Sequence, residues 1–375
     1  MLEQNFYLKR LLELKNNFSV KIISGVRGVG KTTLLKAFAE NLRSEGVAEE
    51  EIIFLDCATD ERFKNFQTLY EFVEARTLEA ERFFLLIDEV DSVDESEKAI
   101  NALFVGAPAE FYVTASSEMF IEKISALLPD NCDVLKIYPL SFTEYTKNFS
   151  EAEALSNYLH FGGMPGTLGA NKNFLSKLLC GMTYEIMFDF VGKNSLRQAG
   201  LFHTLMKILA QNVCGTISLI ELIDRLNCKA VTLKSYLNCS AGLFQRIPRF
   251  DIKEAEFIKG GEKIYCIDNG LLCALAEVDE KFLPENAVYV ELLRRGFSVS
   301  NGKFGVMNIN FVAKRGDEKI FIQVLPPDNS ISVRKITRPL RALPADAEKI
   351  LITPNPEKNF GDIKNITLHD FLLNV

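Results

Sequence analysis

Hydrophobic and polar positions along the first 147 residues follow a repeating order, in which a short apolar run is succeeded by a longer stretch with helical periodicity. Short apolar runs with helical connections are typical of parallel strands that are buried on both faces. Right-handed crossovers between such strands place helices on both sides of one sheet. The pattern predicts an α/β fold with a five-stranded parallel sheet, whose strands we expect at 20–24, 52–55, 83–87, 110–116 and 134–140.

The pattern changes beyond residue 147. Residues 148–199 are mainly helical and predict a helical lid or linker. Residues 200–280 predict a winged helix-turn-helix, with three helices before two strands. In residues 281–375, the order helix, three strands, helix and two strands predicts a small α/β domain. We therefore expect four segments, which are 1–147, 148–199, 200–280 and 281–375.

The first expected strand runs into a glycine-rich turn that opens a helix. Gly25, Gly30, Lys31 and Thr32 occupy every fixed position of the phosphate-loop pattern G-x-x-x-x-G-K-[ST]. Glycines let successive backbone N–H groups approach a di- or triphosphate, and the positive end of the helix favours that charge. We expect Lys31 to reach the β and γ phosphates of ATP, and Thr32 to bind Mg²⁺. The nucleotide-binding candidates are Gly25, Val26, Arg27, Gly28, Val29, Gly30, Lys31, Thr32 and Thr33.

Two carboxylates end the third expected strand. The run FFLLIDE, residues 83–89, places Asp88 and Glu89 at the carboxyl end of a buried parallel strand, where open α/β sheets bind ligands. We expect Asp88 to hold Mg²⁺ through water, and Glu89 to orient and polarise the attacking water. Lys31 and Glu89 are therefore the catalytic candidates, while Thr32 and Asp88 are the candidates for the metal.

Hydroxyl side chains end the fourth expected strand. Thr114 and Ser116 are candidates for sensing the γ phosphate, because they lie at the edge of the sheet where the phosphate loop also ends. Ser117 follows them directly. Capping of the next helix by a serine explains the same residues equally well, so both interpretations stay open.

Composition excludes several classes of protein. The chain has 375 residues, of which 47% are hydrophobic and 25% charged, as in ordinary soluble globular proteins. No apolar run approaches the ~20 residues of a membrane span, and the N-terminus has no signal-peptide core, so we expect a cytoplasmic protein without membrane contact. The eight cysteines form no CxxC pair and there are only three histidines, which argues against structural zinc.

Basic side chains in the expected winged helix are candidates for contact with nucleic-acid phosphates. The net charge of −7 is uneven, with acidic residues in excess over 51–100 and basic residues in excess over 201–250. The candidates are Lys229, Lys234, Arg246 and Arg249. Few base-reading side chains lie on the expected third helix, so a module that contacts protein is the alternative to DNA binding.

Five motifs in this order resemble the bacterial AAA+-type ATPases that carry a C-terminal domain of restriction-endonuclease-like fold. They are GVRGVGKTTLL, LLIDEV, VTASS, YPLSFTEY at 138–145 and FGGMPG at 161–166. The resemblance covers nearly the whole chain. It implies that a glycine-proline motif in the lid, here Gly163 and Pro165, lies against the nucleotide. A plain turn between helices explains these two residues equally well.

The same resemblance implies which positions of the last segment correspond to a nuclease site. Active members of that fold combine a helix glutamate, acidic residues on the second strand, and Glu/Gln-x-Lys on the third. The matching positions here are Glu285, Asn308, Asn310, Gln323 and Leu325. Neutral amides are poor Mg²⁺ ligands, and no lysine follows Gln323 at the required spacing. We therefore expect a degenerate domain that does not cut nucleic acid.

Together these features predict an ATPase that uses Mg²⁺ and hydrolyses ATP slowly, and that couples ATP and ADP states to a protein partner of unknown identity. An ATP-dependent homo-oligomer is also expected as a candidate state, because no arginine finger is assigned within the chain. The alternative is a regulator or scaffold that holds ADP without turnover. A metal-dependent nuclease is the third and least favoured class.

Overall fold

A computed structural model describes residues 5–77, 83–107, 109–147, 151–328, 332–354 and 359–373. The chain divides into two compact units. The first comprises Met1–Ile137 and Glu185–Arg197, and the second comprises Tyr138–Tyr184 and Gln198–Val375. Over the described ranges, none of the helices combines the length and the apolar character needed to cross a bilayer.

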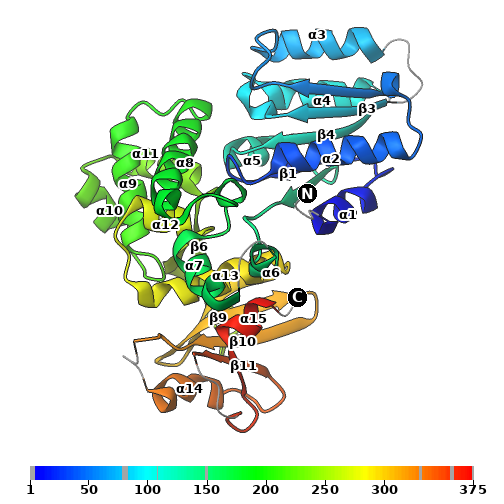
Figure 1. The fold of residues 1–375 in the computed structure, drawn as a ribbon. Coiled ribbons are helices and arrows are strands. Elements are labelled where there is room, and N and C mark those ends of the chain that lie inside the picture. The colour runs from blue at the N-terminus through cyan, green and yellow to red at the C-terminus, as the bar shows by residue number, and fades with distance from the viewer. Residues whose placement is uncertain are drawn as a thin grey trace. The chain divides into compact units, whose positions relative to one another are not determined.

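The first unit contains a five-stranded sheet in the order β2-β3-β4-β1-β5, and every neighbouring pair is parallel (Figure 1). This confirms the predicted fold class. The strands are β1 (Val20–Ser24), β2 (Ile52–Asp56), β3 (Phe83–Asp88), β4 (Ala109–Ala115) and β5 (Cys132–Lys136). The fifth strand begins and ends earlier than the predicted 134–140, because the backbone of β1 pairs with Cys132–Lys136.

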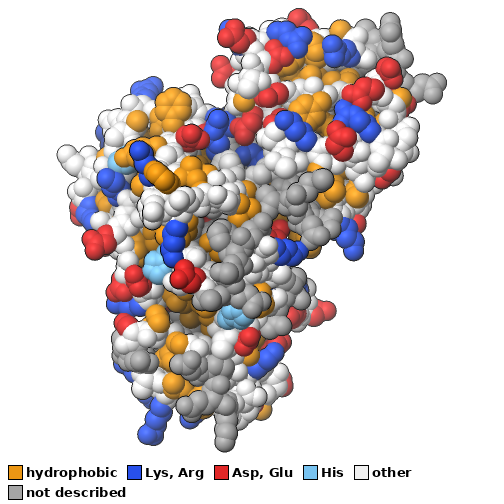
Figure 2. Space-filling view, viewed as in Figure 1, with side chains coloured by type: hydrophobic (Ala, Val, Ile, Leu, Met, Phe, Trp, Pro, Cys, Tyr) orange, Lys and Arg blue, Asp and Glu red, His pale blue; other side chains and the backbone are white. Residues whose placement is uncertain are grey.

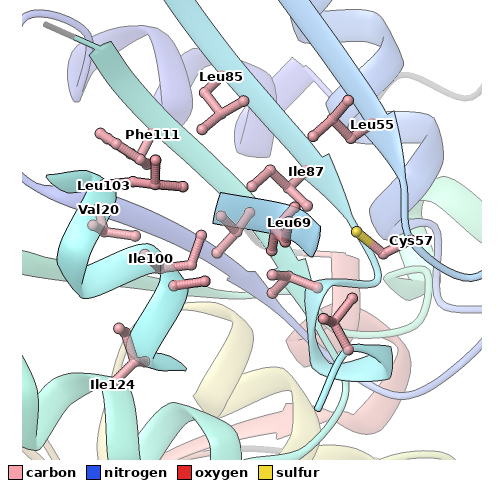
Figure 3. Packing of buried hydrophobic residues seen from close by; sticks show 14 of the residues in the cluster. Val20, Leu55, Cys57, Leu69, Leu85, Ile87, Ile100, Leu103, Phe111 and Ile124 are labelled. Atoms are coloured by element: carbon pink, nitrogen blue, oxygen red, sulfur yellow. The ribbon is translucent and has the colours of Figure 1, made fainter. Parts of the chain in front are cut away.

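Helices cover both faces of this sheet. On one face, α3, α4 and α5 pack apolar side chains such as Leu69, Ile100 and Ile124 against strand residues such as Leu85 and Phe111 (Figure 3). On the other face lies α2, whose Phe38 ring packs against Tyr112 of β4 with centroids 4.3 Å apart and the ring planes tilted by 37°. The helices are α1 (Asn5–Glu13), α2 (Lys31–Ser44), α3 (Phe66–Thr77), α4 (Ser96–Gly106) and α5 (Glu118–Leu127).

The second unit is built on a seven-stranded mixed sheet in the order β12-β11-β10-β9-β8-β6-β7. Its strands are β6 (Phe244–Asp251), β7 (Glu256–Cys266), β8 (Ser298–Phe304), β9 (Met307–Arg315), β10 (Glu318–Val324), β11 (Glu348–Thr353) and β12 (Lys364–Thr367). The antiparallel pair β6–β7 corresponds to the two strands expected after the three helices of 200–280. These strands pair with β8 through β6, so the sheet continues across the expected boundary at residue 280.

The second unit contains the helices predicted from the sequence, together with short helices at 142–146, 269–275 and 368–373 that were not predicted. They are α6 (Phe142–Thr146), α7 (Glu151–Phe161), α9 (Ala199–Gln211), α10 (Leu219–Leu226), α11 (Ala230–Ser240), α12 (Asn269–Leu275), α13 (Leu283–Arg294), α14 (Val333–Arg341) and α15 (Leu368–Leu373). The long helix α8 (Lys172–Lys193) is divided between the units: residues 172–184 belong to the second unit, and the remainder belongs to the first.

Candidate nucleotide-binding site

The phosphate loop connects the buried strand β1 to α2 and has a backbone that requires glycine. A Cβ atom on Gly25 would lie 2.8 Å from the carbonyl oxygen of Ile137 and 2.9 Å from a methyl carbon of Val29. Gly30 adopts a left-handed conformation, with φ of 109°, and caps the N-terminus of α2. Both constraints arise because the loop must fold tightly over the end of β1. The loop therefore has the shape that the sequence pattern predicts.

The side chains of the loop are divided between core and solvent. Val26 and Val29 are buried and anchor the loop to the domain. Arg27, Gly28 and Thr33 are exposed, whereas Thr32 is half-buried at the start of α2.

Lys31 lies inside the loop and is 3% exposed. Its ammonium group donates hydrogen bonds to the carbonyl oxygens of Gly25, at 3.0 Å, and Val26, at 3.3 Å. It also lies 3.4 Å from Oε1 of Glu89. The structure thus brings the two catalytic candidates together, although 58 residues separate them along the chain.

Asp88 ends β3 and is held by Thr114 of the neighbouring strand β4. The Thr114 hydroxyl donates to Oδ1 of Asp88 at 2.6 Å and accepts a hydrogen bond from the backbone N–H of Glu89 at 2.8 Å. Both side chains are buried. Thr114 therefore orients the two carboxylate residues, a contact that the sequence analysis did not identify.

Glu89 is the residue on which the cations of the site converge. Its backbone adopts a left-handed conformation, with φ of 52°, which starts a short 3₁₀ turn at 90–92. Its carboxylate contacts the ammonium of Lys31 through Oε1 and that of Lys193 through Oε2. Burial alone would raise the pKa of Glu89, but the two ammonium groups and their hydrogen bonds outweigh burial and lower the pKa.

Lys193, the last residue of α8, was missed by the sequence analysis. Besides Glu89, its ammonium group contacts Asp91 at 2.9 Å, Asp189 at 3.3 Å and the Ser116 hydroxyl at 2.8 Å. Burial would lower the pKa of Lys193, but Asp91, Glu89 and Asp189 together raise it. The signal that could have been noticed is the spacing of Asp189 and Lys193, which places them one turn apart on a helix.

Asp91 and the serines after β4 complete this cluster. Oδ2 of Asp91 accepts hydrogen bonds from the backbone N–H groups of Ser116 and Ser117, both at 2.8 Å. The hydroxyl of Ser116 donates to Asp189 at 2.6 Å. Ser117 caps α5 by accepting from the N–H of Phe120, which confirms the capping interpretation for that serine. The roles of Thr114 and Ser116 as phosphate sensors stay predictions.

A cavity of about 720 Å³ adjoins the cluster within the first unit. Asp91, Ser117 and Lys193 form part of its wall, together with Lys98 and Lys123. On the phosphate-loop side, the guanidinium of Arg27 lies 3.7 Å from Asp189. The catalytic candidates thus lie among groups of both charges.

The oxygen atoms of Asp88 and Thr32 suit a Mg²⁺ ion that is bound together with a nucleotide. Such an ion is typically bound by one or two protein oxygens, several waters and the phosphates, rather than by a cage of carboxylates. Asp88 and Thr32 supply that small number of oxygens. No cluster of three or more His, Cys, Asp or Glu side chains arranged for a metal occurs in the described ranges.

Gly163 and Pro165 lie in the second unit, in the turn after α7. A Cβ atom on Gly163 would lie 2.4 Å from the carbonyl oxygen of Leu140, and its N–H donates to Asp268 at 2.7 Å. Pro165 starts a short 3₁₀ turn. These contacts account for both residues as parts of a tight turn, while their contact with nucleotide stays a prediction.

The four basic candidates for nucleic-acid contact lie on α11 and β6 or next to them. Lys229, Lys234 and Arg246 are exposed and Arg249 is half-buried. Arg246 lies 3.3 Å from Glu262, so part of its charge is neutralised. On the coloured part of the face drawn in Figure 2, Lys and Arg side chains are interspersed with Asp and Glu and form no single basic patch.

The side chains at the positions that match a nuclease site make contacts within the fold. Asn310 and Gln323 join β9 to β10: the N–H of Asn310 donates to Oε1 of Gln323 at 3.0 Å, and Oδ1 of Asn310 accepts from the N–H of Val324 at 3.2 Å. Gln323 also donates to the carbonyl oxygen of Asn308 at 3.0 Å. Leu325 is buried in the core.

Glu285 is engaged elsewhere in the second unit. It accepts hydrogen bonds from Tyr265 at 2.6 Å and from Lys263 at 3.0 Å, both on β7. The carboxylate at the helix position is therefore already paired with a cation and a hydroxyl.

Family comparison agrees with the geometry of the first unit. A family model described as "AAA domain" matches residues 17–146. This part of the chain, which carries the phosphate loop, is thus similar to AAA domains. A second model, described as "Domain of unknown function (DUF8612)", matches residues 152–281.

The chain is also similar to curated proteins and solved structures. It is 29% identical to an uncharacterized protein of Haemophilus influenzae, covering 100% of this chain and 99% of the relative. It is 28% identical to an uncharacterized protein of Methanocaldococcus jannaschii, covering 81% and 74%.

Two solved structures from Thermotoga maritima have lower similarity. The RuvB Holliday junction branch migration motor is 16% identical with a TM-score of 0.34, covering 65% of this chain and 90% of that one. A DNA polymerase III gamma subunit-related protein is 9% identical with a TM-score of 0.31, covering 63% and 97%. Scores this low carry no conclusion about activity.

Proposed function

We propose that the AAA-type domain binds Mg-ATP and hydrolyses it slowly. The observation that carries this proposal is the contact of the Lys31 ammonium with Glu89 at 3.4 Å, beside the buried carboxylate of Asp88. In this proposal Lys31 binds the β and γ phosphates, Thr32 and Asp88 hold Mg²⁺, and Glu89 accepts a proton from the attacking water. A Mg²⁺ ion held there would neutralise charge on the phosphates.

In this proposal, Glu89 can act as a base only after nucleotide has bound. A carboxylate whose pKa is lowered by two ammonium groups is a weak base. When Lys31 turns toward phosphates, one of the two cations leaves Glu89, and the carboxylate becomes more basic. Hydrolysis is therefore coupled to correct seating of the phosphates at Lys31.

Nucleotide binding and phosphate release by the purified chain, with Lys31→Ala alongside, test this proposal. Lys31→Ala removes the cation nearest the phosphates, so ATP affinity should fall about tenfold or more. Exposed Lys98, which pairs with Glu95, offers a matched control, and Lys98→Ala should leave affinity unchanged. Equal ATP affinity of wild type and Lys31→Ala would contradict the proposal.

The rival proposal is a regulator that holds ADP without turnover. The double ion pair on Glu89 favours it, since a carboxylate in that arrangement does not accept a proton readily. ATP-dependent assembly measured by light scattering separates the two, because a neighbouring subunit could then supply the missing arginine finger. Assembly with ATP and phosphate release support the hydrolase, whereas tight ADP binding without either supports the regulator.

For the second unit we propose a role in binding a partner, with a winged helix in 200–280 and a degenerate endonuclease-like fold in 281–375. The hydrogen bonds that occupy Asn310 and Gln323 support the absence of nuclease chemistry. Incubation with single- and double-stranded DNA and RNA in Mg²⁺ and Mn²⁺ is the test. Cleavage that Glu285→Ala abolishes would overturn this part of the proposal.

A further inference from the structure

We propose that Lys193 is a positioning residue for Glu89 in the hydrolysis reaction, an inference that rests on the proposed function. Lys193 holds Oε2 of the carboxylate while Lys31 lies at Oε1. If Lys31 moves to the phosphates, Oε2 is still held and Oε1 becomes free to accept a proton from water. The contact with Lys193 thus leaves Oε1 as the oxygen that accepts the proton, and it fixes the orientation of the carboxylate.

The position of Lys193 is itself determined by the groups around it. Asp91 at 2.9 Å, Asp189 at 3.3 Å and the hydroxyl of Ser116 at 2.8 Å surround its ammonium group. The carboxylate of Asp91 is itself held in place, because it accepts hydrogen bonds from two backbone N–H groups just before α5. The side chain of Lys193 is 8% exposed, so little water competes for these contacts. An ammonium group fixed in this way can hold a carboxylate in one orientation.

Removal of the Lys193 charge has a predictable electrostatic effect. The charged groups facing Glu89 or its partner Lys193 are Lys31 on α2, Asp88 on β3, Asp91 in the following turn, and Asp189 on α8, with Arg27 beyond Asp189. Without Lys193, Oε2 of Glu89 loses its ion pair, while Oε1 keeps the contact with Lys31. The carboxylate would then lose its fixed orientation once Lys31 moves to the phosphates.

The helix that carries Lys193 also connects this site, along the chain, to the second unit. Lys193 is the last residue of α8, and residues 172–184 of the same helix belong to the second unit. If a partner shifted or rotated α8, Lys193 would move with the helix and its ion pair with Glu89 would change. Small movements of a packed helix are a common way in which one site controls another.

The experiment compares ATP hydrolysis by wild type, Lys193→Met and Lys193→Arg under the same conditions. Lys193→Met should lower kcat ~10-fold or more with little change in KM, because phosphate binding does not use this residue. Lys193→Arg keeps a cation beside Oε2 of Glu89 and should restore most of the lost kcat.

Three further measurements keep the outcomes distinct. Lys98→Met removes an exposed lysine from the wall of the same cavity and should change neither kcat nor KM. Binding of MgADP and urea unfolding establish that each variant is folded, and Lys193→Gln replaces the methionine variant if that variant unfolds. An active wild type with inactive Glu89→Gln but an unchanged kcat in Lys193→Met would overturn the role of Lys193 alone. A Glu89→Gln variant as active as wild type would instead overturn the proposed function.

Discussion

Lys31 and Lys193 contact opposite oxygens of the same carboxylate, that of Glu89. One lysine comes from the phosphate loop and the other from the end of α8, 104 residues after Glu89. The carboxylate proposed as the general base is therefore shared between a residue that meets phosphate and a residue that does not. This arrangement links the phosphate loop, the carboxylate of Glu89 and the end of α8 through ion pairs within the first unit.

Replacement of Thr114 by valine should destabilise the first unit by about 1–3 kcal/mol, because the buried Asp88 loses a donor and the Glu89 N–H loses an acceptor. Urea unfolding of both forms measures this loss. The matched control is Thr204→Val on α9, whose exposed hydroxyl donates only to the carbonyl oxygen of Gly200. Equal losses in the two variants would contradict the bridging role of Thr114.

Asp268 should make stability decrease as pH rises. Burial raises its pKa from 3.8 to about 6, although hydrogen bonds from backbone N–H groups, including those of Gly163 and Leu271, lower it. The folded chain thus holds this proton more tightly than the unfolded chain does. The resulting stabilisation is complete below about pH 4, is lost as pH rises through about 6, and amounts to about 3 kcal/mol.

Asp268→Asn should remove that part of the pH dependence. Urea unfolding between pH 4 and 7 gives the free energy of unfolding of each form, and the variant should show a flatter slope than wild type. Exposed Asp317 provides the control, since Asp317→Asn should leave the slope unchanged. Parallel slopes for wild type and Asp268→Asn would show that the buried carboxyl does not titrate in this range.

If α11 contacts nucleic acid, Lys229→Ala and Lys234→Ala should each reduce the salt dependence of binding. The slope of log affinity against log salt shrinks by about one for each phosphate contact removed. Fluorescence anisotropy with a labelled duplex measures the slope, and Lys207→Ala on α9 is the control. No binding at low salt would favour the alternative in which this module contacts protein.

The sequence was sufficient for the parts of the molecule that have local signals. The glycine spacing around Lys31 and the carboxylates that end β3 predicted which residues meet, because parallel strands end at one edge of their sheet. In the second unit the pattern predicted the strands and the longer helices, whereas the short helices α6, α12 and α15 were not predicted. These features depend on short-range periodicity and on turn chemistry.

The remaining parts depend on contacts between distant segments. The spacing of Asp189 and Lys193 indicates only that the two side chains lie one turn apart on a helix, and it does not indicate that the end of α8 lies beside Glu89. A lysine at the C-terminus of a helix is also explained by the helix dipole. The parallel pairing of β6 with β8 likewise joins segments about 50 residues apart and leaves no local trace. Long-range pairing of this kind therefore has to be read from the structure.

Phosphate release by wild type and Glu89→Gln, measured side by side with saturating Mg-ATP, tests the central claim most directly. The glutamine keeps the size of the side chain but cannot accept a proton, so ATP binding should persist while turnover falls about 10²-fold or more. A fluorescent ATP analogue verifies that both forms bind nucleotide. The account predicts release by wild type and a near-complete loss in Glu89→Gln; equal rates in the two forms would contradict it.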